Sequence, residues 1–323
     1  MSSFWNIWVW VLTLGSLVGC FLLLRMCLKN FAGVEEGESM GHTFDGIEEL
    51  NNPLPKWWST FFLLTIIWAF GYIALYGLGN WTGLLGWKSS NQGILNLAES
   101  KAKTLENLQK DSGVLVQYDR EVAAADAKFG PIFEAYAARS IEDLATDGEA
   151  LKVGQRLFIQ NCAQCHGSDA HGTTGFPNLT DKDWLYGGTP EVIKETIMNG
   201  RIASGMMAWE GALGGDQGVK EVAAYVISLS GRSVDPELAK AGKDKFALCA
   251  GCHGPDGQGS LALGMPMGAP NLTDNIWLYG GSQRAIESSI RNGRAGVMPP
   301  WKDILGEEKV HLISAYVYSL SQD

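Results

Sequence analysis

The sequence predicts a mainly α-helical membrane protein with two N-terminal transmembrane helices, a helical linker and two tandem copies of one small domain. Three observations predict this: two uncharged apolar runs near the N-terminus, a following stretch rich in Ala, Glu and Lys, and an internal repeat in the C-terminal half. Of the 323 residues, 46% are hydrophobic and 19% are charged, which is less charge than a soluble surface needs. The expected segments are a first membrane helix (1–30), a cytoplasmic loop (31–56), a second membrane helix (57–80), a periplasmic linker (81–147) and the two domains (148–232 and 233–323).

The two apolar runs cover residues 4–24 and 57–79. As helices rising about 1.5 Å per residue, both span a hydrocarbon core of about 30 Å. A cleaved signal peptide is the alternative for the first run, but its N-terminal end has no Lys or Arg, it is too long, and no small-residue cleavage pattern follows it. Membrane lipid is therefore an expected partner. Tryptophans suit the interfacial aromatic belts; they are Trp5, Trp8, Trp10, Trp57 and Trp58.

Basic residues set the orientation of the two helices. Arg25, Lys29 and Lys56 flank the connecting loop, whereas residues 1–4 and 80–87 contain no basic residue. The positive-inside rule then puts the loop in the cytoplasm and both termini in the periplasm. The formal net charge of −10 argues against nucleic acid as a partner.

Other residues of this region have structural interpretations. Cys20 and Cys27 are far from any His at ligand spacing and are expected to be small buried side chains. Pro53 and Pro55 are expected to fix the entry of the chain into the second membrane helix. In the linker, helical spacing is patchy and Pro131 is expected to break it, so residues 81–147 are interpreted as helical segments of a solvated spacer.

From about residue 148 the sequence repeats itself. The offset between matching segments drifts only from 87 to 93 and back to 91, which indicates two tandem copies of one small module. The matches are CAQCHG with CAGCHG, PNLTDKDWLYGG with PNLTDNIWLYGG, NGR with NGR, MMAW with MPPW, and AAYVISLS with SAYVYSLS.

Each copy is expected to begin and end with an amphipathic helix. Residues 149–162 and 236–249 carry apolar side chains at helical spacing and run into a Cys, and residues 219–230 and 307–320 form the terminal helices. Between them lie loops rich in Gly, Pro and Asn, with too little hydrophobic material for a core. A bulky apolar ligand is expected to complete each core.

A Cys-x-x-Cys-His motif occurs once in each copy. Two thiols at this spacing also occur in redox dithiols, disulfides and halves of zinc sites, but a zinc site needs a second Cys or His pair. The adjoining His favours haem c, with two thioether bonds to the porphyrin and the imidazole on the iron. One haem is assigned to Cys162, Cys165 and His166, and a second to Cys249, Cys252 and His253.

A low-spin electron carrier needs a second axial ligand, and a Met sulfur favours the reduced state. Met298 is the candidate in the second copy, and alignment on the shared Trp selects Met206 in the first, with Met207 as the fallback. Met265 and Met267 are interpreted as packing residues. Whether each Met binds the iron of its own copy is open, because tandem repeats can exchange equivalent segments.

The other histidines and the recurring aromatic and basic residues also have assignments. His171 is kept as an alternative axial ligand, while His42 and His311 are expected to be exposed or hydrogen-bonded, since none of the three recurs in both copies. Aromatic and basic residues that do recur are expected to wall the haem pockets or bind propionates; they are Trp184, Trp277, Tyr186, Tyr279, Arg201 and Arg294.

The segment GHTFDGIEELNNPLPKWW (41–58) resembles the signature of the membrane-anchored diheme cytochrome c subunit of cbb3-type cytochrome c oxidases. The resemblance extends to the anchor, the linker and both Cys-x-x-Cys-His modules, and the added first helix is a departure from many members. It implies two class I cytochrome c domains in the periplasm, anchored in the bacterial inner membrane. It also implies three protein partners: a catalytic haem–copper subunit, a monohaem cytochrome c subunit, and a soluble periplasmic cytochrome c as electron donor.

The implied role is electron transfer toward oxygen in aerobic or microaerobic respiration, within a proton-pumping complex. No catalytic site is expected on the chain itself, since both axial positions are filled and no nucleophile with a base appears. Two alternatives are a diheme cytochrome c peroxidase, which needs a displaceable axial ligand, and a free-standing anchored diheme shuttle.

Overall fold

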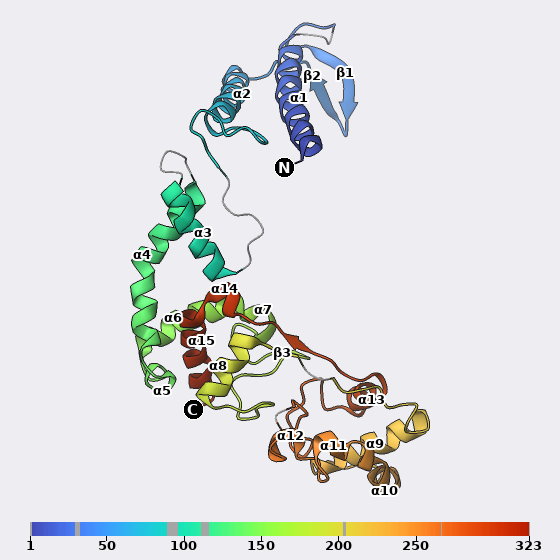
Figure 1. The fold of residues 1–323 in the computed structure, drawn as a ribbon. Helices are drawn as coiled ribbons and strands as arrows, with labels where there is room; N and C mark the ends of the chain where they lie inside the picture. The colour runs from blue at the N-terminus through green and yellow to red at the C-terminus, as the bar shows by residue number, and fades with distance from the viewer. Residues whose placement is uncertain are drawn as a thin grey trace. The chain divides into compact units, whose positions relative to one another are not determined.

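Figure 1 shows a computed structural model of the chain, which is mainly helical and describes residues 2–29, 33–88, 96–110, 116–202, 205–265 and 267–322. The chain divides into two compact units, Met1–Ile94 with Ser100–Ala125, and Leu95–Glu99 with Asp126–Asp323. Each unit is described by itself below.

The first unit contains the two apolar helices, α1 (Ser3–Cys27) and α2 (Lys56–Tyr76), both long and apolar enough to cross a membrane. Only 6% and 11% of their most apolar windows are buried, so neither is the core helix of a soluble domain. Pro55 precedes α2 directly.

The covered side chains of α1 recur at spacings of three and four, so they share one face, a seam toward α2 and the segment that follows it; they are Asn6, Val9, Trp10, Thr13, Leu14, Leu17, Cys20 and Leu24. Cys20 is therefore half-buried in this seam, as expected. The same expectation is wrong for Cys27, which is exposed because it is the last residue of α1 and lies three residues past Leu24, the last covered residue of the seam.

The loop between these helices contains a β-hairpin that the sequence analysis missed. Strand β1 (Ser39–Phe44) pairs antiparallel with β2 (Ile47–Leu50). Asp45 and Gly46 connect them, both at positive φ (50° and 81°). Asp-Gly between two runs of strand-forming residues is a strong sequence signal for a tight hairpin, so the motif was available in the sequence.

The linker forms α3 (Leu97–Lys110) and α4 (Gln117–Ala137). The prediction that Pro131 breaks the helix is wrong, because α4 continues through it. Pro131 removes one backbone donor, but the residue before it is Gly130. The clash that normally drives a residue before Pro out of the helical region involves a Cβ, which Gly130 does not have.

The end of the linker is packed against the C-terminal helix, so its interpretation as a solvated spacer is wrong there. Phe133 and Tyr136 of α4, with Ile141 and Leu144 of α5 (Ile141–Leu144), pack against the C-terminal helix α15 (Glu307–Leu320). His311 Nε2 of α15 donates to the Arg139 carbonyl at 2.9 Å. These residues are buried by a partner surface on α15, which the periodicity of the linker itself does not show.

An ion-pair cluster fastens this junction to α6 (Gly148–Asn161). The Arg139 guanidinium donates to Asp143 and Asp147, each at 2.7 Å, and Asp147 also accepts from the first amides of α6. The hydrogen bonds from Arg139 lower the pKa of both carboxyl groups below the ordinary value. Groups with a lowered pKa in the folded state stabilise the fold only above that pKa.

We expect Arg139→Met to unfold at lower denaturant concentration than the unchanged chain at pH 7. This difference should vanish as the pH falls through the lowered pKa values of Asp143 and Asp147, because the protonated carboxyls no longer attract the guanidinium. The measurement is urea unfolding of the full chain in detergent at several pH values. Arg156→Met, at an exposed position of α6, is the control. A difference that persists unchanged at low pH would contradict the expectation.

The repeated copies provide the remaining elements. The first copy contributes α6, α7 (Ala163–His166), α8 (Pro190–Asn199), β3 (Arg201–Ile202) and α9 (Asp216–Leu229). The second contributes α10 (Pro236–Lys245), η1 (Phe246–Leu248), α11 (Ala250–His253), α12 (Gly259–Ala262), α13 (Gln283–Asn292), β4 (Val297–Met298), α14 (Lys302–Leu305) and α15. The four predicted amphipathic helices are confirmed as α6, α10 with η1, α9 and α15.

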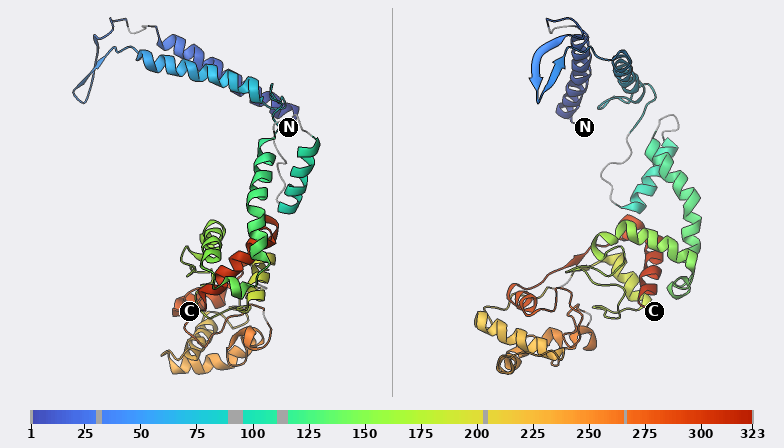
Figure 2. Two further views of the ribbon diagram at one scale, coloured as in Figure 1. Left: turned by 90° about the vertical axis from the view of Figure 1, so that its left-hand side faces the viewer. Right: turned by 180° about the vertical axis from the view of Figure 1, so that it is seen from behind.

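These elements form two hydrophobic cores, and each core takes helices from both copies. In core 1, α6 and α8 of the first copy pack against α15 of the second, with Phe158 and Tyr316 rings 5.4 Å apart. In core 2, α10 and α13 of the second copy pack against α9 of the first, with Tyr225 and Phe246 rings 5.1 Å apart. Figures 1 and 2 show the red helix α15 beside α6 and α8, and α9 beside α10. The packing thus crosses the expected boundary between residues 232 and 233.

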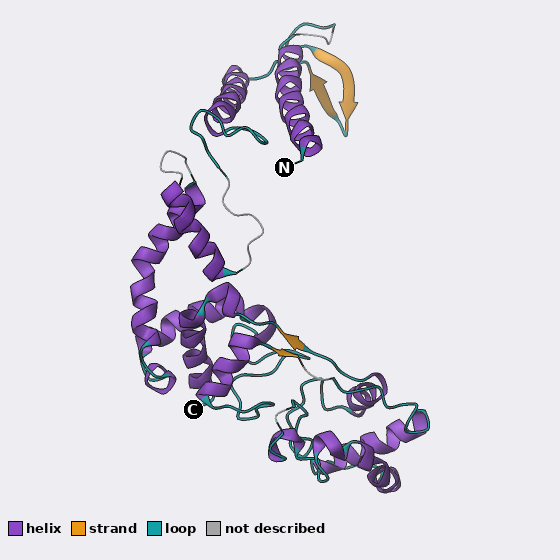
Figure 3. Ribbon diagram, viewed as in Figure 1, coloured by secondary structure: helices purple, strands orange, loops and turns teal. Residues whose placement is uncertain are grey.

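Two antiparallel strands carry the chain between the cores. Strand β3 pairs with β4 in the register Arg201 opposite Met298, and Met206 pairs with Arg294 through two backbone hydrogen bonds of 2.7 and 2.8 Å. Figure 3 shows this ribbon in orange between the helices of the two cores. Arg201 corresponds to Arg294 and Met206 to Met298 in the repeat, so the ribbon has approximate twofold symmetry.

Candidate haem sites

Each Cys-x-x-Cys-His motif forms a short helical turn at the end of the first helix of its copy. Cys162 ends α6 and begins α7, which carries Cys165 and ends at His166. Cys249 likewise begins α11, which ends at His253. In both turns the His amide donates to the first Cys carbonyl at 3.0 Å, so the two sulfurs and the imidazole project from one helical turn.

A repeated proline carbonyl orients both histidines. His166 Nδ1 lies 3.0 Å from the Pro177 carbonyl oxygen, and His253 Nδ1 lies 3.0 Å from that of Pro270. A carbonyl can only accept, so Nδ1 carries the proton and Nε2 keeps its lone pair. Burial lowers the pKa of both imidazoles, which favours the neutral form that a metal binds.

The thiols differ from those of a redox-active dithiol. Cys162 and Cys249 are half-buried, Cys165 and Cys252 are exposed, and all four are free. Burial raises the pKa of the Cys162 thiol to about 11, with a further contribution from Cys165, and raises that of Cys249. Redox-active thiols need a lowered pKa, so these positions do not favour dithiol chemistry.

The methionines reach the motifs from the opposite copy. Met298 packs against core 1 with Cys162, Leu179 and Trp184, all of the first copy. Met206 packs against core 2 with Cys249, Leu272 and Trp277, all of the second copy. The structure therefore places each predicted Met against the same core as the first Cys of the other copy's Cys-x-x-Cys-His turn.

Tryptophan amides fasten the exchanged segments. Trp301, just after Met298, donates its backbone N–H to the Ile197 carbonyl at 3.0 Å. Trp209, just after Met206, donates to the Ile290 carbonyl, also at 3.0 Å. Both acceptors lie near the C-terminal ends of α8 and α13, where helix carbonyls lack partners within the helix.

The other recurring residues also lie at these sites. Trp184 and Trp277 pack against cores 1 and 2. The Arg201 guanidinium lies 4.9 Å from the centre of the Tyr186 ring, and Arg294 lies 4.4 Å from that of Tyr279. In the ribbon Arg201 is paired with Met298 and Arg294 with Met206, so each Arg–Tyr pair adjoins a methionine segment.

The fallback methionine and the other histidines lie elsewhere. Met207 is 65% exposed, whereas Met206 packs against core 2, which favours Met206 of the two. Met265 and Met267 are 43% and 39% exposed, and in the described part of the chain neither is among the side chains that pack against core 1 or core 2, so the structure does not support their interpretation as packing residues. His171 is exposed with Nδ1 3.1 Å from the Asp169 carbonyl.

The remaining two histidines have local partners. His42 is exposed in β1, with Nδ1 3.5 Å from the Glu49 carboxylate. His311 is buried at the contact with the linker described above.

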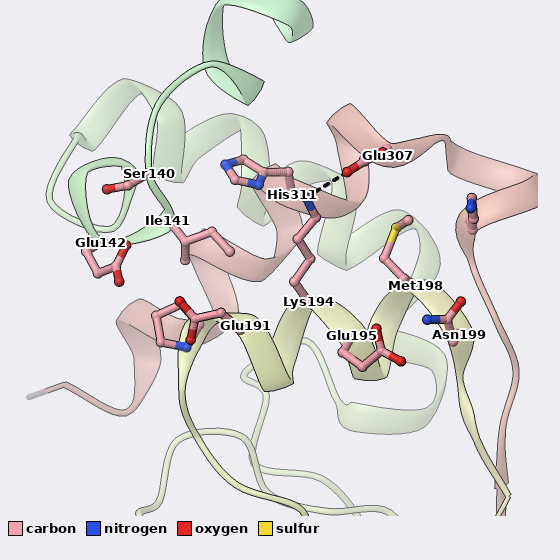
Figure 4. A pocket seen from close by; sticks show the side chains of 12 residues that line it. Ser140, Ile141, Glu142, Glu191, Lys194, Glu195, Met198, Asn199, Glu307 and His311 are labelled. Carbon is pink, nitrogen blue, oxygen red and sulfur yellow. Dashed lines mark hydrogen bonds and ion pairs between the residues drawn. The ribbon is translucent and has the colours of Figure 1, made fainter.

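A cavity of about 430 Å³ lies outside both sites, between α5, α8 and α15. Figure 4 shows Lys194 directed toward Glu307, at 2.9 Å, with His311 beside this ion pair. The Cys-x-x-Cys-His residues and the two methionines do not line it. This cavity is therefore separate from the haem sites.

Sequence reasoning missed two classes of site residue. Pro177 and Pro270 act through their carbonyls, and Gly200 and Gly293 lie against the methionine segments. All four belong to segments that repeat, PNLTD and NGR. The repetition of these segments is visible in the sequence. The role of a proline carbonyl or of a glycine without a side chain, however, depends on which segment of the fold packs against it.

The residues present fit a covalently bound haem. Each site has two thiols on one helical turn, an imidazole with its Nε2 free, a Met sulfur from another segment, and Trp and Leu side chains around them. This donor set matches a six-coordinate haem c with His and Met ligands.

Comparison with known proteins covers almost the entire chain. Residues 36–82 match the family model described as the N-terminal domain of cytochrome oxidase-cbb3, FixP. Residues 149–226 and 238–317 both match the model described as cytochrome c oxidase, cbb3-type, subunit III.

Full-length relatives extend this similarity. The cbb3-type cytochrome c oxidase subunit CcoP of Rubrivivax gelatinosus is 41% identical over 323 residues, covering 99% of this chain and 96% of the relative. Subunit CcoP of Azospirillum brasilense is 38% identical, with 91% and 99% covered, and subunit FixP of Sinorhizobium medicae is 39% identical, with 90% and 97% covered.

Proposed function

Because the chain belongs to the family of cbb3-type cytochrome c oxidase subunits named CcoP and FixP, we propose that it binds two haem c groups and relays electrons between them. It is an electron-transfer subunit of an oxidoreductase complex. The relay takes electrons from a soluble periplasmic cytochrome c and passes them to the catalytic haem–copper subunit. A monohaem cytochrome c subunit is a further partner, and the complex translocates protons.

The first haem is attached to Cys162 and Cys165 with His166 as one axial ligand, and the second to Cys249 and Cys252 with His253. The second axial ligands are exchanged between the copies: Met298 for the first haem and Met206 for the second. The carrying observation is that each Cys-x-x-Cys-His turn, whose imidazole is held by a proline carbonyl, packs its first Cys against a core that also contains the methionine of the other copy.

A bound haem would supply one-electron redox chemistry, and the residues of this chain would hold the haem, orient its ligands and limit its contact with water. The Pro177 and Pro270 carbonyls hold the proton on Nδ1 and so keep the imidazole orientation constant. Met298 and Met206, each on a packed segment, would hold the second ligand position of a bound haem and so exclude oxygen or peroxide from it. The side chains of cores 1 and 2 exclude water, which favours a small reorganisation during electron transfer.

The topology follows from the positive-inside pattern. Helices α1 and α2 anchor the chain in the bacterial inner membrane, with the acidic hairpin loop in the cytoplasm and the two class I haem modules in the periplasm. Anchoring raises the effective concentration of the relay beside its acceptor.

We expect two covalent haems per chain when the protein is matured in a host that attaches haem c. A pyridine haemochrome assay on the purified full chain should give two haems, and Cys249→Ser with Cys252→Ser should give one. The reduced protein should not bind carbon monoxide. A colourless chain, a bound zinc ion in place of haem, or a high-spin haem that binds carbon monoxide would each contradict the proposed function.

A further inference from the structure

We propose that Gly200 and Gly293 are positioning residues for the exchanged methionines, and that the missing side chain at each sets how closely a methionine segment approaches its haem site. This inference rests on the proposed function, since its readout is the axial ligation of the two haems. Both glycines belong to the repeated Asn-Gly-Arg motif, and the chemistry of the haem sites gives the glycine of this motif no other role.

Gly200 lies directly against the segment that carries Met298. It ends α8 with φ of +69°, and a Cβ at this position would overlap the Met298 carbonyl oxygen and lie 2.8 Å from the Pro299 carbonyl carbon and the Pro300 nitrogen. All three are backbone atoms, so no side-chain rotation can relieve the overlap. The segment would have to move away from core 1.

Gly293 repeats this arrangement at the second site. It ends α13 with φ of +73°, and a Cβ would overlap the Met206 carbonyl oxygen and lie 2.9 Å from the Met207 carbonyl carbon. Again the atoms belong to the backbone. The two contacts are related by the repeat, and in both the glycine and the methionine come from different copies.

The neighbouring contacts leave the methionine segments little freedom to shift along the helix ends. On one side Trp301 and Trp209 are hydrogen-bonded to Ile197 and Ile290. On the other side the ribbon pairs Arg201 with Met298 and Met206 with Arg294. A segment that is tied at both ends and pushed in the middle would move its Met away from the core, so the Met would be a poorer ligand for a bound haem.

The experiment uses the sulfur-to-iron charge-transfer band of the oxidised full chain, which requires a Met ligand. In the background Met206→His, only the first haem can give this band. There, Gly200→Ala should lower its amplitude about tenfold, because overpacking against backbone atoms displaces the segment. In the same background Gly293→Ala should leave the band unchanged. In the background Met298→His, the effects of the two glycine variants should be reversed.

Gly231→Ala is the matched control. Gly231 has φ of +73°, equal to that of Gly293, but nothing lies within 4 Å of the position of an added Cβ. It therefore reproduces the backbone strain without the overlap, and the band should remain. Gly205→Ala is a milder second variant, since its Cβ would lie 3.3 Å from the Arg294 carbonyl oxygen; in the Met298→His background it should weaken the band only partly.

Haem content separates the possible outcomes. Two haems per chain with loss of the band only in the paired glycine variant supports the positioning role. Two haems with an undiminished band in Gly200→Ala, or equal loss in Gly231→Ala, overturns it. If Gly200→Ala loses haem altogether, the test passes to Gly205→Ala in the Met298→His background. An undiminished charge-transfer band in that variant overturns the positioning role of close glycine contacts. Absence of haem or of the band in the unchanged chain would instead contradict the proposed function.

Discussion

Met298→His should lower the reduction potential of the haem attached to Cys162 and Cys165, although Met298 lies more than a hundred residues further along the chain. Met298 packs against core 1 with Cys162 and Trp184, and among the described residues it is not one of the side chains that pack against core 2. A Met ligand raises the potential relative to His, and axial ligands span about 0.8 V, so we expect a decrease on the order of 0.1 V or more. Redox titration followed in the visible spectrum measures it.

The titration must identify which haem responds. Met298→His is therefore measured in the chain with Cys249→Ser and Cys252→Ser, which keeps only the first haem, and in the chain with Cys162→Ser and Cys165→Ser, which keeps only the second. The decrease should occur in the former and not in the latter. Met206→His is the matched variant and should give the opposite result. A decrease in the haem of the same copy would show that the methionines are not exchanged.

The second large effect concerns stability. Phe158→Ala should reduce the free energy of unfolding by about 3–5 kcal/mol, since Phe158 is fully buried in core 1 and large aromatic truncations leave a cavity. Phe246→Ala is the corresponding change in core 2, where the ring is 2% exposed. Urea unfolding in detergent, followed by helical circular dichroism and by the Soret absorbance, measures both.

A double-mutant cycle tests the exchange of helices in the same experiment. The ring contacts are Phe158 with Tyr316 and Phe246 with Tyr225, and aromatic pairs contribute about 0.5–1.5 kcal/mol beyond their buried area. The effects of Phe158→Ala and Tyr316→Ala should therefore not be additive, whereas those of Phe158→Ala and Tyr225→Ala should be, because these residues belong to different cores. The opposite pattern would mean that each copy folds on its own.

Most elements and most candidate site residues could be predicted, for physical reasons that act locally. The amphipathic spacing of 149–162 and 307–320 indicated α6 and α15 because a helix that buries one face shows it at every third or fourth residue. Cys-x-x-Cys-His indicates its chemistry because the two thiols that bond the porphyrin and the imidazole that binds the iron lie on one turn. The incorrect predictions have other causes. The helix continues through Pro131 because Gly130 precedes it, and the linker end is buried by a partner surface on α15. The hairpin is the exception, because its Asp-Gly turn signal is local.

Alone, the sequence determined the two membrane-spanning runs, the repeat, the two Cys-x-x-Cys-His turns and Met206 and Met298 as the methionines that recur. Only the tertiary structure decided that Met298 and α15 join the first core while Met206 and α9 join the second. The reason is the repeat itself: both copies carry nearly the same helix faces and loops, so either pairing satisfies the local pattern. The choice therefore depends on contacts between distant segments, above all the β3–β4 ribbon, which pairs a strand of one copy with a strand of the other.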